Sequence, residues 1–366
     1  MKCKLGDICT KIGSGATPRG GKDAYCDKGI TLVRSQNVLD FSFSDSGLAF
    51  INEEQAAKLN NVEVLSGDVL LNITGDSVAR ACTMDDSFLP ARVNQHVAII
   101  RGKNDIVINR YLLYFLQWQK SHLLQLASGG ATRNALTKGM IEQLEIELPS
   151  LEQQKTIVAI LGSLDDKIAL NNKINDNLEQ QAQAVYINLF ITNVNPDWKQ
   201  GKLSDLVSVK YGRDHKKLAD GEYPVYGSGG IMRYVERPLY DKESVLIPRK
   251  GTLNNVIYIY RPFWSVDTMF YTEMKMPNIA KFVYHFIKSK DLASMNAGSA
   301  VPSMTTDILN AIEVAIPSAQ TLEAFENIVA PMYKAIQENN EQSKRLAVLR
   351  DTLLPKLMSG KIKIQS

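Results

Sequence analysis

Two segments decide the fold of this chain, because one repeats the other: LEIELPSLEQQKTIVAILGSLDDKIALNN (residues 144–172) and IEVAIPSAQTLEAFENIVAPMYKAIQENN (residues 312–340). The match has no gap at a spacing of 168 residues, and it extends from Asn134 to Phe190 in the first copy and from Pro302 to Met358 in the second. Two amphipathic helices can come to resemble each other by convergence. This match, however, begins in a strand and a Pro-Ser turn, where helical periodicity cannot produce it. It therefore indicates that one structural unit is used twice.

Each copy continues into a long helix with apolar residues at alternating spacings of four and three, which is the pattern of a coiled-coil seam. About 40 residues of helix would span roughly 60 Å, which is too long for a helix buried in one small domain. The predicted seam of the first helix is Ile157, Leu161, Leu164, Ile168, Asn171, Leu178, Val185 and Leu189. The predicted seam of the second helix is Phe325, Val329, Met332, Ile336, Asn339, Leu346, Leu353 and Leu357.

Four residues interrupt these apolar seams. Pro331 predicts that the second helix is kinked or starts anew near Ala330. Arg350 occupies a seam position, where we expect its stem to pack and its charged head to reach solvent. Asn171 and Asn339 hold equivalent seam positions, where they either fix the register of the helix pair or lie at its fringe.

The repeat divides the chain into two mixed domains, each followed by a long helix. Residues 1–150 form the first predicted mixed domain, 151–192 the first long helix, 193–318 the second mixed domain, and 319–366 the second long helix with a tail. In the first domain we predict a helix over residues 109–126, in which Leu112, Leu113, Leu116, Leu123 and Leu124 can face a core. The fold class is thus α+β: two mixed α/β domains separated by two long helices that pair as an antiparallel coiled coil with pseudo-two-fold symmetry.

Composition excludes several classes of protein. The 366 residues carry a formal net charge of +3, and the first 150 residues hold 16 basic and 16 acidic side chains, so any anion-binding surface must be a local cluster. No run of about 18 apolar residues is present, and the N-terminal residues lack an apolar signal core. The four cysteines form no Cys-x-x-Cys pair. These features predict a reduced cytoplasmic protein with small buried thiols and no membrane span.

Catalytic motifs are incomplete wherever the sequence approaches one. The glycine-rich loop at residues 15–23 resembles a phosphate-binding loop, but Lys22 is one place late and Asp23 replaces the required Ser or Thr. Residues 195–198 (NPDW) resemble the Asn-Pro-Pro-aromatic motif of amino-methyltransferases, but Asp197 replaces the second proline. The four histidines are scattered, and no Gly-x-Ser-x-Gly elbow occurs. We therefore expect a non-catalytic chain without metal or cofactor of its own.

Several motifs together resemble one known family, the specificity subunits of type I restriction-modification systems. The motifs are SGGATRNALT (residues 128–137) running into IELPSLEQQ (146–154), GDVLLNITG (67–75), VNQHV (93–97), YPVYGSGGI (223–231), PRKGT (248–252) and PFWSVDT (262–268). The resemblance covers essentially the whole chain, and the order of its parts matches the repeat.

The resemblance implies a DNA-binding subunit in which each recognition domain reads one half of a split target on double-stranded DNA. The paired helices would set the unread gap and dock two methyltransferase (modification) subunits. Those partners would carry adenine-N6 methylation with S-adenosylmethionine, and motor and nuclease (restriction) subunits would join them to cut unmodified DNA with ATP and Mg²⁺. This chain would then supply specificity for DNA methylation and DNA restriction, in defence against foreign DNA.

DNA reading needs cations for phosphates and Arg, Lys, Asn or Gln for base edges. In the first domain, polar loops contain the candidates Thr17, Arg19, Gly20, Gly21, Lys22, Arg34, Gln36, Asn37, Arg80, Arg92 and Arg133. The two glycines would let the backbone approach phosphate closely. Ordinary surface or ion-paired arginines explain Arg34, Arg80 and Arg92 equally well.

In the second domain, the densest basic stretch of the chain (residues 210–217) and the segment after an apolar strand contain the candidates. They are Lys210, Tyr211, Arg213, His215, Lys216, Lys217, Ser228, Arg249, Lys250 and Asn254. A solvated loop could look like the basic stretch. Arg249 and Lys250 directly follow a strand, so a rigid support would present their charges.

Two alternatives remain open at this point. The chain could be a self-sufficient nuclease or methyltransferase, in which case the pure chain would turn over DNA in the presence of Mg²⁺ and S-adenosylmethionine. Alternatively, a non-DNA scaffold could hold two ligand-binding domains apart by a coiled coil. Co-purification separates this scaffold from the DNA-specificity hypothesis, because only the DNA-specificity hypothesis expects a methyltransferase subunit to stay bound to the helices.

Overall fold

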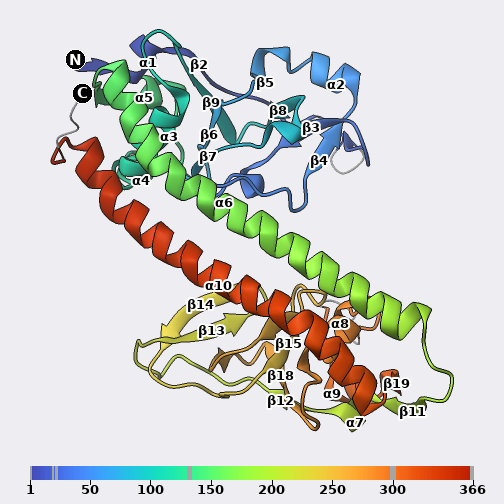
Figure 1. Cartoon of the computed structure of the whole chain (residues 1–366). Coiled ribbons are helices and arrows are strands. Elements are labelled where there is room, and N and C mark those ends of the chain that lie inside the picture. The colour runs from blue at the N-terminus through green and yellow to red at the C-terminus, as the bar shows by residue number, and fades with distance from the viewer. Residues whose placement is uncertain (1, 19, 21–23, 130–133, 297–301, 363–366) are drawn as a thin grey trace. The chain divides into compact units, whose positions relative to one another are not determined.

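The computed structural model describes residues 2–18, 20, 24–129, 134–296 and 302–362. The chain divides into two compact units, and each long helix contributes one half to each unit. Unit 1 comprises residues 1–172 and 340–366, and unit 2 comprises residues 173–339. We describe each unit by itself (Figure 1).

Unit 1 contains two four-stranded sheets and one two-stranded sheet, ordered β2-β9-β6-β7, β4-β3-β8-β5 and β1-β10. Its strands are β1 (Lys2–Lys4), β2 (Cys9–Ser14), β3 (Ile30–Val33), β4 (Ala49–Ile51), β5 (Glu63–Val64), β6 (Val69–Asn72), β7 (Ala81–Thr83), β8 (Ala91–Val93), β9 (Val97–Gly102) and β10 (Glu145–Glu147). Its short helices are α1 (Leu5–Ile8), α2 (Glu53–Ala57), α3 (Asn109–Trp118), α4 (Lys120–Ser128) and α5 (Lys138–Glu142), with 3-10 turns at Ser35–Asn37, Asn60–Val62 and Asp86–Phe88.

Unit 2 repeats this plan with sheets ordered β12-β18-β15-β16, β14-β13-β17 and β11-β19. Its strands are β11 (Lys199–Lys202), β12 (Val207–Tyr211), β13 (Tyr223–Gly227), β14 (Gly230–Val235), β15 (Ser244–Pro248), β16 (Ile257–Ile259), β17 (Trp264–Ser265), β18 (Met269–Met274) and β19 (Glu313–Ile316). Its short helices are α7 (Leu203–Leu206), α8 (Ala280–Lys288) and α9 (Thr306–Asn310).

The two units share their element order and strand pairings, except that α2, β5 and α4 of unit 1 have no counterpart among the described elements of unit 2. The second sheet of each contains one parallel pair, β3 with β8 and β13 with β17, among antiparallel neighbours. The strand that closes each unit pairs with the strand that opens it, so Ile146 lies opposite Cys3 and Val314 lies opposite Gly201. The predicted repeat and the predicted α+β fold class are confirmed by these equivalent sheets.

The long helices are α6 (Leu151–Ile187), which ends in a π-helical turn at Asn188–Thr192, and α10 (Ala319–Met358). In unit 1, Ile157 and Leu161 of α6 share the core with Leu354 and Leu357 of α10. Early residues of α6 thus meet late residues of α10, which is antiparallel pairing (Figure 1).

The same pairing recurs in unit 2 with the two helices exchanging roles. Ala182 and Tyr186 of α6 there share the core with Phe325 and Val329 of α10. Early residues of α10 therefore meet late residues of α6. The seam residues predicted from the heptad pattern are all buried or half-buried in their units.

The seam asparagines bond across the helix pair. Asn171 is fully buried, and its Nδ2 donates to Gln342 Oε1 at 2.9 Å and to Ser343 Oγ at 3.1 Å. Asn339 Nδ2 donates to Asn175 Oδ1 at 2.9 Å. Because Asn171–Ser343 and Asn339–Asn175 are equivalent under the 168-residue repeat, both contacts favour the register hypothesis over fringe positions.

The structure decides one alternative for α10 and contradicts one expectation. The helix does not start anew near Ala330, because α10 is continuous over 40 residues and Pro331 is exposed within it. The head of Arg350 does not reach solvent: its side chain is 11% exposed and bonds Asp165 Oδ1 at 2.9 Å. Its guanidinium carbon also lies 3.6 Å from the centre of the Phe41 ring, so a buried partner replaces water.

The helix predicted over residues 109–126 consists of two helices, α3 and α4, that meet at Gln119. Leu112, Leu113, Leu116 and Leu123 face the core as expected. Leu124 is 42% exposed, so its predicted place in the core was wrong. The break between the helices changes the rotational phase of α4, which a single uninterrupted period cannot anticipate.

A buried polar network joins α8 to both long helices inside unit 2. His285 is fully buried, with Nδ1 lying 2.6 Å from Gln183 Oε1 of α6 and Nε2 lying 2.9 Å from the Tyr333 hydroxyl of α10. Burial, the largest effect, lowers the pKa of His285 to about 4, against an opposing contribution from Glu179 and a further lowering by Lys288.

The depressed pKa of His285 predicts acid sensitivity in unit 2. Between about pH 6.5, the ordinary His pKa, and pH 4, His285 is protonated in the unfolded chain but not in the folded chain. The free energy of unfolding therefore falls as the pH drops through this range and is unaffected above it. The loss should reach about 3 kcal/mol at the acid end, from roughly 1.4 kcal/mol for each pKa unit. Hydrogen exchange followed by mass spectrometry on peptides from α8, corrected for the pH dependence of intrinsic exchange, measures this loss in unit 2 by itself.

His285→Gln should flatten this pH dependence, and His122→Gln, at an exposed histidine of unit 1, should leave it unchanged. Equal pH profiles for the wild-type chain and His285→Gln would contradict the prediction.

Candidate nucleic-acid interface

Exposed basic and polar side chains converge in unit 2 where three strands end. Tyr211 closes β12, Arg249 and Lys250 follow β15, and Asp267 follows β17. Arg249 stacks on the Tyr211 ring at 5.4 Å and donates from Nη1 to the Asp267 carbonyl at 3.2 Å. The stack places the Arg249 cation and the Tyr211 ring on one surface, where Tyr211 is 52% exposed. We call these strand ends and the following basic loop, residues 212–218, the unit 2 loop cluster.

The backbone of this basic loop is fixed although its side chains are exposed. Arg213 N donates to the Ser265 carbonyl at 2.8 Å, and Trp264 Nε1 donates to the Arg213 carbonyl at 2.8 Å. Lys216 N donates to Asp214 Oδ1 at 3.0 Å, and this bond, as its main cause, lowers the pKa of Asp214. Arg213, Lys216 and Lys217 are therefore presented in solvent by a held loop, which reduces the entropy cost of binding an anion.

A glycine makes the approach of this loop possible in each unit. A Cβ on Gly212 would come within 2.0 Å of the Val266 carbonyl oxygen, and one on Gly15 within 1.8 Å of the Val93 carbonyl oxygen. Gly15 directly follows β2 of the sheet β2-β9-β6-β7, and Gly212 directly follows β12 of the equivalent sheet β12-β18-β15-β16. The two units thus lead a polar loop over the end of the parallel strand pair in the same way.

In unit 1, a chain of polar groups occupies the corresponding surface. Thr17 Oγ1 donates to Gln95 Oε1, Gln95 Nε2 lies 3.1 Å from His96 Nε2, and His96 Nδ1 lies 2.6 Å from Thr74 Oγ1. Gln95, His96 and Thr74 are not among the predicted site residues. The sequence motifs that contain these three residues resemble strands, but each residue lies just past the end of a strand. Loops that follow strands often carry functional side chains, so this position could have identified them.

Other predicted side chains hold their own loops together. Asn37 is fully buried and its Nδ2 donates to the carbonyls of Ser44 and Ser46. Arg92 is 6% exposed and pairs with Glu63 Oε1 at 3.2 Å, which is the ion-paired alternative for this arginine. Asn37 and Arg92 therefore support the fold of unit 1 and do not belong to the candidate interface.

Three further candidates are partly engaged within the protein. Arg34 donates to the Gly47 carbonyl and lies 5.6 Å over the Tyr25 ring. Asn254 Nδ2 donates to Asp291 Oδ1, and Asn254 Oδ1 accepts a hydrogen bond from Ala293 N. Lys210 lies 3.8 Å from Glu273 in a half-exposed pair.

The remaining predicted residues differ in exposure. Gln36 and Gly20 are exposed, Arg80 and Ser228 are half-buried, and the Nδ1 atom of half-buried His215 is buried without a hydrogen-bond partner. The predictions at Arg19, Gly21, Lys22 and Arg133 lie outside the described residues.

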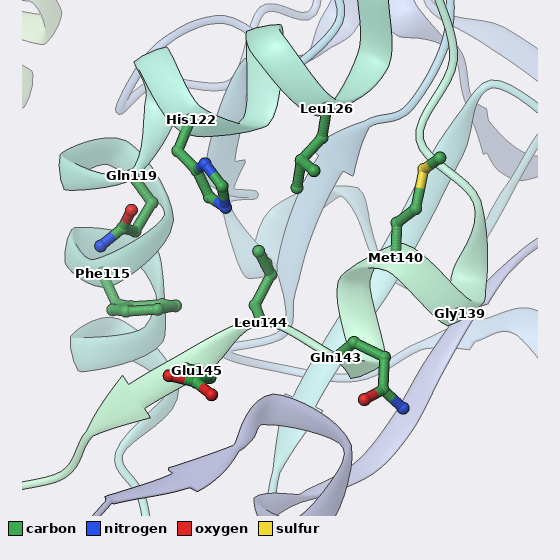
Figure 2. Close-up of a pocket in the computed structure, with 9 residues that line it drawn as sticks. All are labelled: Phe115, Gln119, His122, Leu126, Gly139, Met140, Gln143, Leu144 and Glu145. Carbon is green, nitrogen blue, oxygen red and sulfur yellow. The ribbon is translucent and has the colours of Figure 1, made fainter. Parts of the chain in front are cut away.

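The structure contains a hollow of about 560 Å³ in unit 1, between α3, α4, α5 and β10. Figure 2 shows its lining, in which His122 and Leu126 extend from α4 toward Leu144, Met140 of α5 lies to one side, and Glu145 lies on the strand below. Its lining is largely apolar, with His122 and Glu145 as its titratable groups. Across the part of the chain that the structure describes, no cluster of three metal-ligating side chains occurs. No helix within the described ranges is long and apolar enough to cross a membrane.

The chain therefore contains two equivalent mixed units, each with polar loops at its strand ends and with one half of both α6 and α10. This arrangement defines an internally duplicated α+β protein. The chain belongs to the family described as the Type I restriction modification DNA specificity domain, which matches residues 1–180 and 195–346.

Individual specificity subunits are similar to this chain over nearly its whole length. The type I restriction enzyme MjaIX specificity subunit of Methanocaldococcus jannaschii is 24% identical, over 99% of this chain and 93% of the relative. The HindI specificity subunit of Haemophilus influenzae is 20% identical, over 98% of each chain. The crystal structure of a type I restriction-modification S subunit from M. genitalium has the same fold, with a TM-score of 0.59, 17% identity, and coverage of 98% of this chain and 95% of that one.

Proposed function

We propose that this chain is the non-catalytic, sequence-specific DNA-binding subunit of a type I restriction-modification complex. One observation carries the proposal: the same unit is built twice, and each copy places exposed polar loops over the end of a parallel strand pair. Two unequal sets of side chains on equivalent supports suit a target read as two different halves. Arg213, Lys216, Lys217, Arg249 and Lys250 would bind the phosphates in the second half.

The paired halves of α6 and α10 would set the gap between half-sites and dock the methyltransferase subunits. Ile160 and Ile328 support docking, because they are equivalent under the repeat and remain 38% and 47% exposed. Matching exposed aliphatic residues suit two copies of one partner. S-adenosylmethionine, ATP and Mg²⁺ would then be bound by the partner subunits and not by this chain.

Methylome sequencing tests this function most directly. Cells that express this chain with its methyltransferase should gain methyladenine at one bipartite motif, and cells that lack the chain should not. Methylation without the chain, or failure of the methyltransferase to co-purify with it, would favour the non-DNA scaffold.

Neutralising Lys216 and Lys217 should weaken binding to every DNA sequence, because both side chains are exposed on the held loop. For each phosphate that is no longer bound, the slope of log K against log salt should become shallower by about one unit. Fluorescence anisotropy over a salt series measures this slope for Lys216→Gln with Lys217→Gln. Lys334→Gln with Lys344→Gln on α10 is the matched control, and a slope equal to the control would remove the two lysines from the interface.

A further inference from the structure

The hairpin formed by β13 and β14 contains a bulge at its most exposed apolar residue. Val225 pairs with Arg233 and Tyr226 pairs with Ile231, so Met232 is the extra residue of β14. A bulge of this kind re-aims one side chain. Met232 is 61% exposed, and its neighbours Ile231 and Tyr234 are 42% and 40% exposed. The hairpin of β13 and β14 can be followed in Figure 1, and β14 is the edge strand of its sheet. This edge strand thus exposes an apolar ribbon, made of Ile231, Met232 and Tyr234, to solvent.

Gly227 of the neighbouring strand leaves room for the side chain of Met232. A Cβ on Gly227, the last residue of β13, would come within 2.7 Å of the Met232 sulfur. The absence of a side chain at Gly227 therefore leaves the space across which Met232 lies. The same Cβ position would lie 3.8 Å from Val266 Cγ2, which belongs to the unit 2 core, so the methionine side chain lies over a buried part of the sheet.

The hairpin is tied to the basic segments of the unit 2 loop cluster at its middle and at its tip. From the middle of β14, Arg233 Nη2 donates to the Leu218 carbonyl at 2.9 Å and to Asp220 Oδ1 at 2.8 Å, just after Lys216 and Lys217. At its tip, Asn255 Nδ2 donates to the Ser228 carbonyl at 2.6 Å, from the loop that begins with Arg249 and Lys250. The exposed apolar residues of β14 are therefore connected to both basic segments, in which Lys216, Lys217 and Lys250 are exposed and Arg249 is half-buried.

We propose that the β13–β14 hairpin enters the major groove of DNA and that Met232 reads a thymine there by contact with its C5-methyl group. The inference rests on the proposed function and adds a specificity-determining residue to it. A two-stranded β-ribbon fits the major groove, and the thymine methyl is the one apolar group presented on its floor. The flanking cations would meet the phosphates on the two sides of the groove.

This reading differs in kind from that of unit 1. There the connection between β3 and β4 runs over residues 34–48 and is filled by internal hydrogen bonds of Asn37 and Gln36, instead of a tight hairpin with an exposed apolar face. The two half-sites are consequently read by different chemistry, with apolar contact in the half bound by unit 2. That half-site must contain at least one thymine on either strand.

The test uses the complex of this chain with its methyltransferase and the target found by methylome sequencing. Each thymine of the half-site bound by unit 2 is replaced in turn by deoxyuridine, which removes the methyl group and keeps every hydrogen-bonding group. At one position the wild-type complex should bind about fourfold more weakly, which corresponds to roughly 0.8 kcal/mol for one buried methyl. Met232→Ala should bind thymine and deoxyuridine equally at that position.

Two variants serve as controls. Met232→Leu keeps the apolar contact and should retain the discrimination. Met295→Ala removes a methionine of 37% exposure elsewhere in unit 2 and should also retain it. Thermal unfolding checks that all variants remain folded.

The outcomes separate the inference from the function. Normal DNA binding with no thymine effect, or an effect that persists in Met232→Ala, overturns the inference and leaves the proposed function standing. Reduced retention of the methyltransferase by Met232→Ala, without a thymine effect, makes the hairpin a protein contact and overturns it as well. A complex that binds no duplex overturns the proposed function.

Discussion

Inserting one heptad into each long helix is expected to lengthen the gap between the two half-sites by about three base pairs and to leave both half-sites unchanged. Seven helical residues add roughly 10 Å, and base pairs rise by about 3.4 Å. The natural positions are after Asn172 in α6 and after Asn339 in α10, where the two compact units divide. Methylome sequencing of cells that express the variant with its methyltransferase measures the new motif.

The insertion sites preserve the contacts that define register. The bonds of Asn171 to Gln342 and Ser343 lie on one side of the inserted heptads, and the bond of Asn339 to Asn175 lies on the other. A heptad adds two turns at 3.5 residues per turn, so the apolar seam continues in phase.

Insertion into α6 alone is the control, because it displaces one helix against the other. Asn171 would then lose its partners at a fully buried position, and we expect loss of binding instead of a longer gap. A double insertion that still methylates the original motif would show that the helix pair does not determine the gap.

The repeat and the seam could be predicted because both can be found by comparing residues along the sequence, without knowing which strands pair. A heptad pattern depends on neighbours within a few residues, and a self-match depends on no structure at all. The register role of Asn171 and Asn339 was accessible for the same reason, since the repeat placed them at equivalent seam positions. The strand orders within each unit were not accessible, because they depend on pairings between strands as distant as β1 and β10.

The candidate site was predicted less well, because a basic side chain on a loop looks the same whether it meets DNA or a carboxylate of its own chain. Arg92 finds Glu63 and Asn60 only after β5 and β8 pair. Conversely, Gln95 and His96 become adjacent to Thr17 through the fold, although 78 residues separate Thr17 from Gln95. Loops whose backbone follows a strand, such as the one after β15, were the better guide to exposed cations.

Arg350 gives the clearest case of a partner that periodicity cannot supply. The heptad pattern correctly marks its position as facing the other helix, and general solvation physics then favours an escaping charge. Asp165 lies 185 residues earlier in the sequence, and its side chain is as buried as that of Arg350, at 11% exposure. The Tyr114 hydroxyl donates to the second Asp165 oxygen at 2.8 Å, so the carboxylate is satisfied on both sides.

Arg350→Ala is therefore expected to destabilise unit 1 by about 3 kcal/mol, because truncation leaves a buried carboxylate without its cation. Asp351 adds little to the wild-type arrangement, since it is 60% exposed and well solvated. The same variant also removes the stacking of the guanidinium on Phe41. Hydrogen exchange followed by mass spectrometry on peptides from α3 and α6 measures the destabilisation of unit 1 by itself, which global unfolding of a two-unit chain does not.

Two further variants distinguish an unpaired charge from weakened packing. Arg350→Met combined with Asp165→Leu removes both charges and keeps apolar volume, so it should recover most of the stability that Arg350→Ala forfeits. Lys155→Ala breaks an exposed pair with Glu152 on α6, and it should change protection by less than about 0.5 kcal/mol. If the double variant is as unstable as Arg350→Ala, packing around Phe41 and not the buried charge pair holds this end of α10 on unit 1.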